Sequence, residues 1–416
     1  MRNFSAKFIL LICLLLISGY IFAQNTKIDA EIRSRSELRK GFRTPLANEE
    51  YAAFVTGLRT RLNLAYSDEK LDASIRLQDS RIFGQTGLTD TGNSLGFFEV
   101  WTAYKFTPEF FIKLGRQSLE YDDKRILSST NWNNTGSAHD LLLIKYENDK
   151  IKAHLGLAWN NAGDVMMESL YDIARSYKSM TFAWLEKPLN KITLSALWLN
   201  DALQKGTTPE LINKLIYRNT IGGNVAFSDK ASPLYVYATG YYQFGHDADN
   251  DKLSAYTLAL KASCKLTSAW TVSLGEDYLS GSKHDLEAGK NNTFNKLYGS
   301  NHSFNGSMEY WSTPPAQGLS DLYGGITFKP SGKFDIDFTY HYFTLAQNLA
   351  EADKKGLGSE IDITTNYRVS SQFNIQGGWS AYFKTDQTDI VKNQAGIDTR
   401  FAHWGYIMLT FKPVFL

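Results

Sequence analysis

The chain has 416 residues, of which 43% are hydrophobic and 21% charged, and its formal net charge is +1. A balance so close to neutral does not indicate any particular partner. Nucleic acid is not among the partners that we predict. The chain contains two cysteines, Cys13 and Cys264, and no Cys/His spacing typical of a zinc site. A disulfide framework is therefore excluded, and we predict neither a metal nor another cofactor.

Residues 1–23 have the three parts of a secretory signal peptide. Arg2 and Lys7 are basic, residues 8–17 are apolar, and the small residue Ala23 stands at the expected cleavage site. An uncleaved membrane anchor is the alternative, but this apolar stretch is shorter than the roughly 20 residues that a helix needs to cross a bilayer. We therefore expect cleavage, which lowers the formal charge to −1.

The mature chain, residues 24–416, is predicted to form one β domain. No linker rich in Pro, Gly or Ser divides it. Apolar and polar residues alternate with a period of two from one end to the other, and no long stretch has apolar residues at helical spacing. One face of each strand is expected to meet hydrocarbon and the other face water. The alternation is clearest in residues 71–78 (LDASIRLQ), 333–342 (KFDIDFTYHY), 360–367 (EIDITTNY) and 373–376 (FNIQ).

A soluble β-sandwich or β-helix also shows such alternation, but three features favour a membrane barrel. The candidate strands have about 10–14 residues, which suits a tilted crossing of a membrane better than the usual soluble sheet. Short turns at residues 107–109, 148–150 and 188–190 alternate with longer connections. Aromatic residues near strand ends are expected to face lipid as an interfacial girdle; they are Tyr104, Phe106, Trp159, Trp198, Tyr237 and Trp379.

The predicted fold class is all-β: a transmembrane antiparallel β-barrel of about 18 strands, of the Gram-negative outer-membrane type. The chain ends in residues 404–416 (WGYIMLTFKPVFL), an aromatic closing strand of the kind that the outer-membrane assembly machinery receives. A barrel of this size is expected to have an aqueous lumen. We therefore predict an integral protein of the cell outer membrane, with the lipids of that membrane as partners.

Arginine is concentrated early in the chain, since ten of the fifteen arginines lie between Arg33 and Arg125. Strand alternation places five of them, on three neighbouring strands, on the face opposite the apolar residues and thus toward the lumen. They are Arg33, Arg35, Arg59, Arg61 and Arg76.

These arginines have two possible roles. They could solvate the interior and pair with nearby acids such as Asp29 and Glu31. They could instead bind solute, because a guanidinium holds both oxygens of a carboxylate and keeps its charge at physiological pH. Acids expected to face inward later in the chain, such as Asp335, Asp337, Glu360 and Asp362, would keep that binding weak enough for release.

Two stretches resemble a known family. Residues 113–127 (KLGRQSLEYDDKRIL), with Trp132 after them, resemble the Gly-Arg-Gln segment of the alginate export family of outer-membrane barrels. Residues 296–311 (KLYGSNHSFNGSMEYW) resemble the Tyr-Gly-x-x-His-x-Phe-x-Gly loop of that family. The resemblance covers most of the mature chain and implies an arginine-lined constriction through which a polyuronate passes. It adds Arg116 and Arg125 to the predicted substrate-binding residues.

The first stretch departs from simple expectations at two places. Alternation places Arg116 on the lipid face with Leu114, so we expect a bulge near Gly115 that turns Arg116 inward. Asp122 and Asp123 add acid where the family often has Gly, which argues against selectivity for alginate itself.

One long connection in the later part of the chain, residues 282–318, contains polar residues that need no catalytic role. His302 and Glu309 could suggest a metal or acid–base site, but we predict that they are hydrogen-bonding members of a loop near the barrel mouth. Residues 282–318 are rich in Asn, Gly and aromatic residues, and they are our candidate for a loop that plugs the lumen.

The sequence therefore predicts passive passage of an anionic, alginate-like polysaccharide or oligosaccharide, without a chemical transformation. A general porin for small solutes is the alternative, and the two differ in ion selectivity. A barrel enzyme and an adhesion barrel are further classes, but no Ser/His/Asp constellation with a recognisable local motif favours the enzyme. Periplasmic partners, for export or for uptake, are compatible with either kind of channel.

Overall fold

The computed structural model describes residues 25–47, 50–88, 94–204, 214–349, 354–394 and 401–416. The predicted signal peptide, residues 1–23, lies outside this part of the chain. None of the helices in the described residues is long and apolar enough to cross a membrane.

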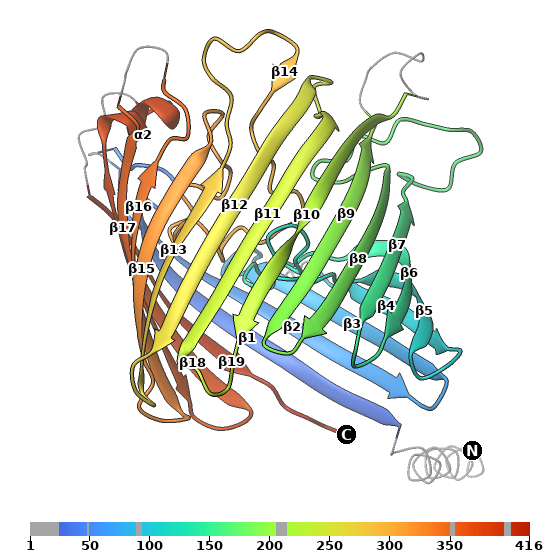
Figure 1. Ribbon diagram of the computed structural model, residues 1–416. Helices are drawn as coiled ribbons and strands as arrows, with labels where there is room; N and C mark the ends of the chain where they lie inside the picture. The colour runs from blue at the N-terminus through green and yellow to red at the C-terminus, as the bar shows by residue number, and fades with distance from the viewer. Residues whose placement is uncertain (1–24, 48–49, 89–93, 205–213, 350–353, 395–400) are drawn as a thin grey trace, which may run out of the picture.

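The described strands form one sheet that closes into a barrel (Figure 1). Eighteen strands build the wall, which confirms the predicted antiparallel β-barrel and its strand number. A two-residue strand, β14 (Lys290–Asn291), pairs in parallel with β12 from a loop, and a short helix, α2 (Asp386–Val391), precedes the last strand. The wall strands are β1 (Thr26–Lys40), β2 (Ala53–Ser67), β3 (Leu71–Ile82), β4 (Gly96–Lys105), β5 (Phe110–Gln117), β6 (His139–Glu147), β7 (Lys152–Trp159), β8 (Ser179–Leu189), β9 (Ile192–Leu203), β10 (Ile216–Ser228), β11 (Leu234–His246), β12 (Lys252–Lys265), β13 (Trp270–Leu279), β15 (Leu319–Phe328), β16 (Phe334–Thr344), β17 (Gly356–Arg368), β18 (Phe373–Lys384) and β19 (Phe401–Phe411).

The first and last strands close the barrel. Their register runs from Ile32 opposite Phe411 to Lys40 opposite His403. Beyond β19, the C-terminal residues continue along β1, and Phe415 N donates to Ile28 O at 2.8 Å. Closure matters because each backbone N–H or C=O left unpaired in hydrocarbon would cost several kcal/mol.

The alternation of apolar and polar residues separates the two faces of the wall. In β2, the side chain of Phe54 is 72% exposed, whereas Arg59, on the opposite face, is 1% exposed. Large apolar residues such as Leu114 and Ile407 are likewise exposed on the outer surface. A band of exposed apolar side chains is what a surface in contact with lipid requires.

Tyr237 of β11 is an exception to the predicted aromatic girdle. Together with Tyr235 it lines a cavity inside the barrel, so the prediction that it faces lipid was wrong. The reason is that β11 has aromatic residues on both faces, with Tyr242 and Phe244 exposed on the outer one. The other five residues of the predicted girdle are exposed.

The connections differ in length between the two ends of the barrel, as predicted. Turns such as residues 106–109 and 148–151 lie at the same end as the C-terminus, which marks the periplasmic side in barrels of this type (Figure 1). The third predicted turn is shorter than expected because Pro188 still belongs to β8. The chain reverses at Asn190, whose φ of 56° suits a tight turn.

Two long connections fold into the barrel and pair with each other. We call them loop A (residues 118–138) and loop B (residues 280–318), and the predicted plug lies within loop B. Leu127 of loop A forms a bridge with Tyr298 of loop B, and Ser128 N donates to Tyr298 O at 3.0 Å.

The loops give the barrel an internal hydrophobic core. Leu127, Met308, Tyr310 and Trp311 all have side chains that are 1% exposed or less. They pack with wall residues into one apolar cluster. The lumen that we expected from the strand number is therefore partly filled by protein.

The two faces of β12 provide a test of the membrane orientation. Leu258, near the middle of β12, is 55% exposed on the outer surface, and the next residue, Ala259, lines an internal cavity. We expect Leu258→Lys to lower the free energy of unfolding by about 2–4 kcal/mol, because the charge would enter hydrocarbon. Urea titration of the barrel refolded in lipid vesicles measures this change. Ala259→Lys is the matched control, and an equal loss in both variants would contradict the assigned faces.

Candidate functional site inside the barrel

Four arginines line one side of the interior, and we call them the arginine wall: Arg33, Arg35, Arg59 and Arg61. Each is 7% exposed or less. The register of β1 and β2 places Arg33 directly opposite Arg59. Like charges in directly opposite positions repel each other, so this wall requires acceptors that offset the repulsion.

Most of those acceptors are main-chain carbonyl oxygens of loop A. Arg33 donates to the oxygens of Asn131 at 2.7 Å, Trp132 at 2.9 Å and Asn133 at 2.9 Å. Arg59 donates to Asn131 O at 2.9 Å and to Asn133 O at 3.0 Å. Arg33 of β1 and Arg59 of β2 therefore share two acceptors in loop A, the carbonyl oxygens of Asn131 and Asn133.

Arg35 adds a further contact to this segment. It donates to Trp132 O at 2.9 Å, and its guanidinium lies 4.2 Å above the centre of the Trp132 ring. Arg35 also pairs with Glu37 at 2.9 Å, and Arg59 pairs with Glu31. The wall thus combines a few carboxylate partners with many neutral ones.

Two donors of the arginine wall have no partner. The Nε atoms of Arg33 and Arg59 are buried and make no hydrogen bond within the described part of the chain. Burying a hydrogen-bond donor without an acceptor is unfavourable, and more so when the group is charged. These N–H groups are therefore available to an acceptor that enters the site.

Arg61 and Arg76 border a cavity at the end of the barrel with the short turns. This inner cavity has a volume of about 750 Å³. Arg61 lies 3.8 Å from the centre of the Phe98 ring and donates to Gln78 at 2.8 Å. Arg76 pairs with Glu99 at 2.7 Å. Arg61 and Arg76 therefore line the inner cavity, and contacts with neighbouring side chains fix the positions of both.

Arg116 does not turn inward by the expected bulge. The pairing of β5 with β4 and with β6 continues through Gly115 without a register shift, so Arg116 stays on the face of Leu114. Gly115 has a φ of 125°, and a Cβ at this position would lie 2.3 Å from Val100 O, so glycine is required there for close approach of the strands. Arg116 pairs with Asp140 at 2.8 Å.

Although it stays on the outer face, Arg116 lies at the end of β5, at the rim of the barrel, and there it borders a second cavity at the end with the long connections. This outer cavity has a volume of about 450 Å³. It is also lined by Arg175 and Tyr177 and by Asn133 of loop A. The residue predicted from the family motif is therefore at the mouth, away from the arginine wall.

Arg125 joins loop A to the barrel and to loop B. Its guanidinium pairs with Asp123 at 3.1 Å and with Asp277 of β13 at 3.1 Å, and it lies 4.1 Å from the centre of the Phe304 ring of loop B. Burial disfavours the charged form, but the two carboxylates outweigh this effect and raise the pKa of Arg125 above its usual value. Arg125 is thus a fully charged structural contact between the loops.

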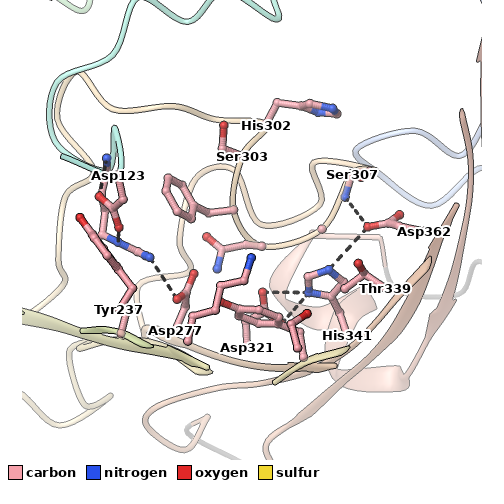
Figure 2. Close-up of a pocket in the computed structure, with 18 of the residues that line it drawn as sticks. Asp123, Tyr237, Asp277, His302, Ser303, Ser307, Asp321, Thr339, His341 and Asp362 are labelled. Atoms are coloured by element: carbon pink, nitrogen blue, oxygen red, sulfur yellow. Dashed lines mark hydrogen bonds and ion pairs between the residues drawn. The ribbon is translucent and has the colours of Figure 1, made fainter. Parts of the chain in front are cut away.

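Arg125 also lines a third cavity, which we call the acidic cavity. Asp123 and Asp277 lie on one side of it (Figure 2). The cavity has a volume of about 540 Å³. On the other side of the cavity from Asp123, His341 of β16 contacts Asp321 at 2.9 Å and Asp362 at 3.6 Å (Figure 2). Cross-strand contacts of this kind depend on register, so the alternation of apolar and polar residues does not predict the roles of Asp277, Asp321 and His341.

Carboxylates of β17 hold the backbone of loop B. Ser307 N donates to Asp362 at 3.1 Å, and Met308 N donates to Glu360 at 2.7 Å. Glu360 and Asp362 were expected to face the lumen as screening charges, and the structure shows that they also fix a loop. Nearby, Lys296 of loop B is buried, and burial lowers its pKa to about 8.

His302 and Glu309 lie in loop B and contact each other at 3.1 Å. The His302 ring stacks on Trp132 of loop A with 3.8 Å between ring centres. Glu309 also pairs with Arg43, which follows β1. Burial acts to raise the pKa of Glu309, but the His302 and Arg43 contacts outweigh burial and lower it. Among the described residues, no group of three or more His, Cys, Asp or Glu side chains could hold a metal ion.

Comparison with known proteins agrees with this architecture. Residues 23–375 match the sequence profile of the family described as alginate export. The sequence matches no curated protein. The BenF-like porin from Pseudomonas fluorescens Pf-5 is similar in structure, with a TM-score of 0.65, 12% identity and coverage of 95% of this chain and 100% of that chain.

Porins of Pseudomonas aeruginosa are also similar. OccK5 (OpdH) has a TM-score of 0.62 and 12% identity, covering 95% of this chain and 99% of that chain. OpdK, in a structure with vanillate, has a TM-score of 0.62 and 11% identity, covering 94% of this chain and 99% of that chain. At this identity the likeness shows the fold alone.

The buried contacts of Arg125 lead to a prediction about stability. We expect Arg125→Gln to lower the free energy of unfolding by about 3–5 kcal/mol, because Asp123 and Asp277 would lose their common cation. Arg368→Gln is the control, since that exposed arginine pairs with Asp335 and its loss is expected to change stability by about 1 kcal/mol or less. Urea unfolding of the refolded barrel measures both. Equal effects in the two variants would contradict a structural role for Arg125.

Proposed function

This chain belongs to the alginate export family and is an outer-membrane β-barrel channel, and we propose that it passes carboxylate-bearing saccharides, alginate-like chains or their oligomers, through its arginine-lined interior. Passage is by diffusion, and the solute leaves chemically unchanged, as is typical of a passive channel.

The arginine wall carries this proposal. Arg33 and Arg61 form no ion pair with a carboxylate of the described residues, and Arg33 and Arg59 each have a buried Nε without an acceptor. A carboxylate binds a guanidinium by two parallel hydrogen bonds, which are stronger than bonds to neutral oxygen. The wall therefore has the donors and the surplus positive charge that a uronate requires.

Cations at both ends of the barrel support the same proposal. Positive charge along a path raises the local concentration of anions and guides them from one site to the next. The outer cavity is bordered by Arg116 and Arg175, and the inner cavity by Lys27, Arg61, Arg76 and Lys412.

A general porin for small solutes is the second candidate. It is favoured by loops A and B, which divide the interior into separate cavities of about 450–750 Å³ that share no lining residue. Cavities of that volume suit small molecules better than a continuous polymer. The acidic cavity would also give such a pore sites for cationic groups.

Ion selectivity distinguishes the two candidates. We expect single-channel current through the refolded barrel in a planar bilayer to be carried mainly by anions and to be blocked by oligouronates. In Arg61→Gln/Arg76→Gln we expect the block to be about tenfold weaker, because two charged donors are lost at the inner cavity. Arg368→Gln, outside the three cavities, is the control. An unselective current without block would leave the general porin.

A further inference from the structure

One short segment of loop A separates the outer cavity from the inner cavity. We call residues 129–137 the partition segment. Thr130, Asn133 and Gly136 line the outer cavity, whereas Ser129 and Asn131 line the inner one. A solute that moves between the two cavities along the arginine wall must therefore pass this segment.

Hydrogen bonds join the two ends of the partition segment to each other. Ser137 N donates to Ser129 O at 2.7 Å, and the hydroxyls of Thr130 and Ser137 lie 2.6 Å apart. A loop whose ends are tied in this way keeps its shape as a compact unit. Its tip, Asn131 to Asn133, is held mainly from outside the loop.

The tip is held by the arginine wall. Arg33, Arg35 and Arg59 donate six hydrogen bonds to the main-chain oxygens of residues 131–133. The acceptors of these six bonds are three neutral carbonyl groups, each of which accepts two. A carboxylate would be a better acceptor for the same donors, since charge-assisted hydrogen bonds are roughly twice as strong as neutral ones.

The contacts of Arg33 and Arg59 also favour replacement of the carbonyl oxygens by a carboxylate. Carbonyl oxygens do not neutralise Arg33, and they do not reach its Nε or the Nε of Arg59. A carboxylate at this position would supply both the missing charge and the missing acceptor. With the tip bound to the arginine wall, the hydrogen-bond donors of Arg33 and Arg59 are therefore satisfied only in part. The stacking of Trp132 on His302 helps to hold the tip in this position.

We propose that the partition segment is a gate that occupies the anion site of the channel, and that an anionic solute opens it by replacing the carbonyl oxygens on Arg33 and Arg59. This inference rests on the proposed passage of carboxylates. The exchange involves hydrogen bonds alone: the guanidinium groups turn from the tip to the solute, and the released tip moves out of the path. A neutral solute of the same size lacks the charge to compete and leaves the gate closed.

A reversible lock tests the gate. A Cβ on Gly57 of β2 would lie 2.3 Å from the side-chain nitrogen of Asn134 in the partition segment. Gly57→Cys/Asn134→Cys therefore places a disulfide between β2 and the partition segment. The background is Cys264→Ser, which removes the cysteine left in the described residues. Uptake of glucuronate and of glucose into vesicles that contain the refolded barrel is then measured before and after reduction with dithiothreitol.

We expect the reduced barrel to pass glucuronate faster than glucose, and the oxidised barrel to pass glucuronate about tenfold more slowly than the reduced one. Equal glucuronate rates in the two states, both faster than glucose, would overturn the gate and leave the anion channel standing. Glucuronate no faster than glucose in the reduced barrel would overturn both.

A second variant tests the gate without a disulfide. Arg33→Gln removes three of the six hydrogen bonds to the tip. We expect glucose uptake to rise severalfold, because the gate opens without an anion, and the preference for glucuronate to fall. Arg368→Gln is the control, with both rates unchanged. Glucose uptake that stays at the original level in Arg33→Gln would contradict a gate held by the arginine wall.

Discussion

The closed ring of backbone hydrogen bonds is the constraint on which the rest of this structure depends. In hydrocarbon every strand must be paired on both sides, so β1 has to meet β19. Eighteen strands fix a circumference, and the circumference fixes an interior too wide for wall side chains alone to fill. Loops A and B fill much of that space with an apolar core. The shape of the remaining cavities, and hence what passes, follows from how these loops are attached.

The attachment relies on charge at both sides of the interior. On one side, cationic side chains of β1 and β2 hold backbone oxygens of loop A; on the other, Glu360 and Asp362 of β17 accept backbone N–H groups of loop B. Main-chain groups thus hydrogen-bond to buried arginines on one side and to buried carboxyl groups on the other. A conventional salt bridge between Arg125 and Asp277 of β13 attaches loop A to a further strand of the wall, and the same guanidinium contacts the Phe304 ring of loop B. The same groups that a solute would meet are therefore also the groups that position the loops.

How far the sequence predicts this arrangement depends on the kind of contact. The strand number, the inner face of β2 and the closing strand follow from the alternation of apolar and polar residues, which can be recognised in each strand by itself. Tyr237 was misassigned because aromatic residues occupy both faces of β11. The hold of Arg33 on residues 131–133 could not be predicted, because its acceptors are carbonyl oxygens, which every residue carries. The Asp321–His341 contact needs the register of β15 with β16, which alternation alone does not fix.

The contacts of loop B extend across the seam between the two ends of the chain. Met308 O accepts a hydrogen bond from the backbone N–H of Arg43, which follows β1. Met308 N donates to Glu360 of β17, on the other side of the seam, where β18 and β19 lie between β17 and β1. Tyr310 OH adds a bond to Gly41 O at 2.8 Å. A barrel would open sideways into the bilayer most easily where its first and last strands meet. Here that junction is braced from inside, so lateral opening would require loop B to leave the interior first.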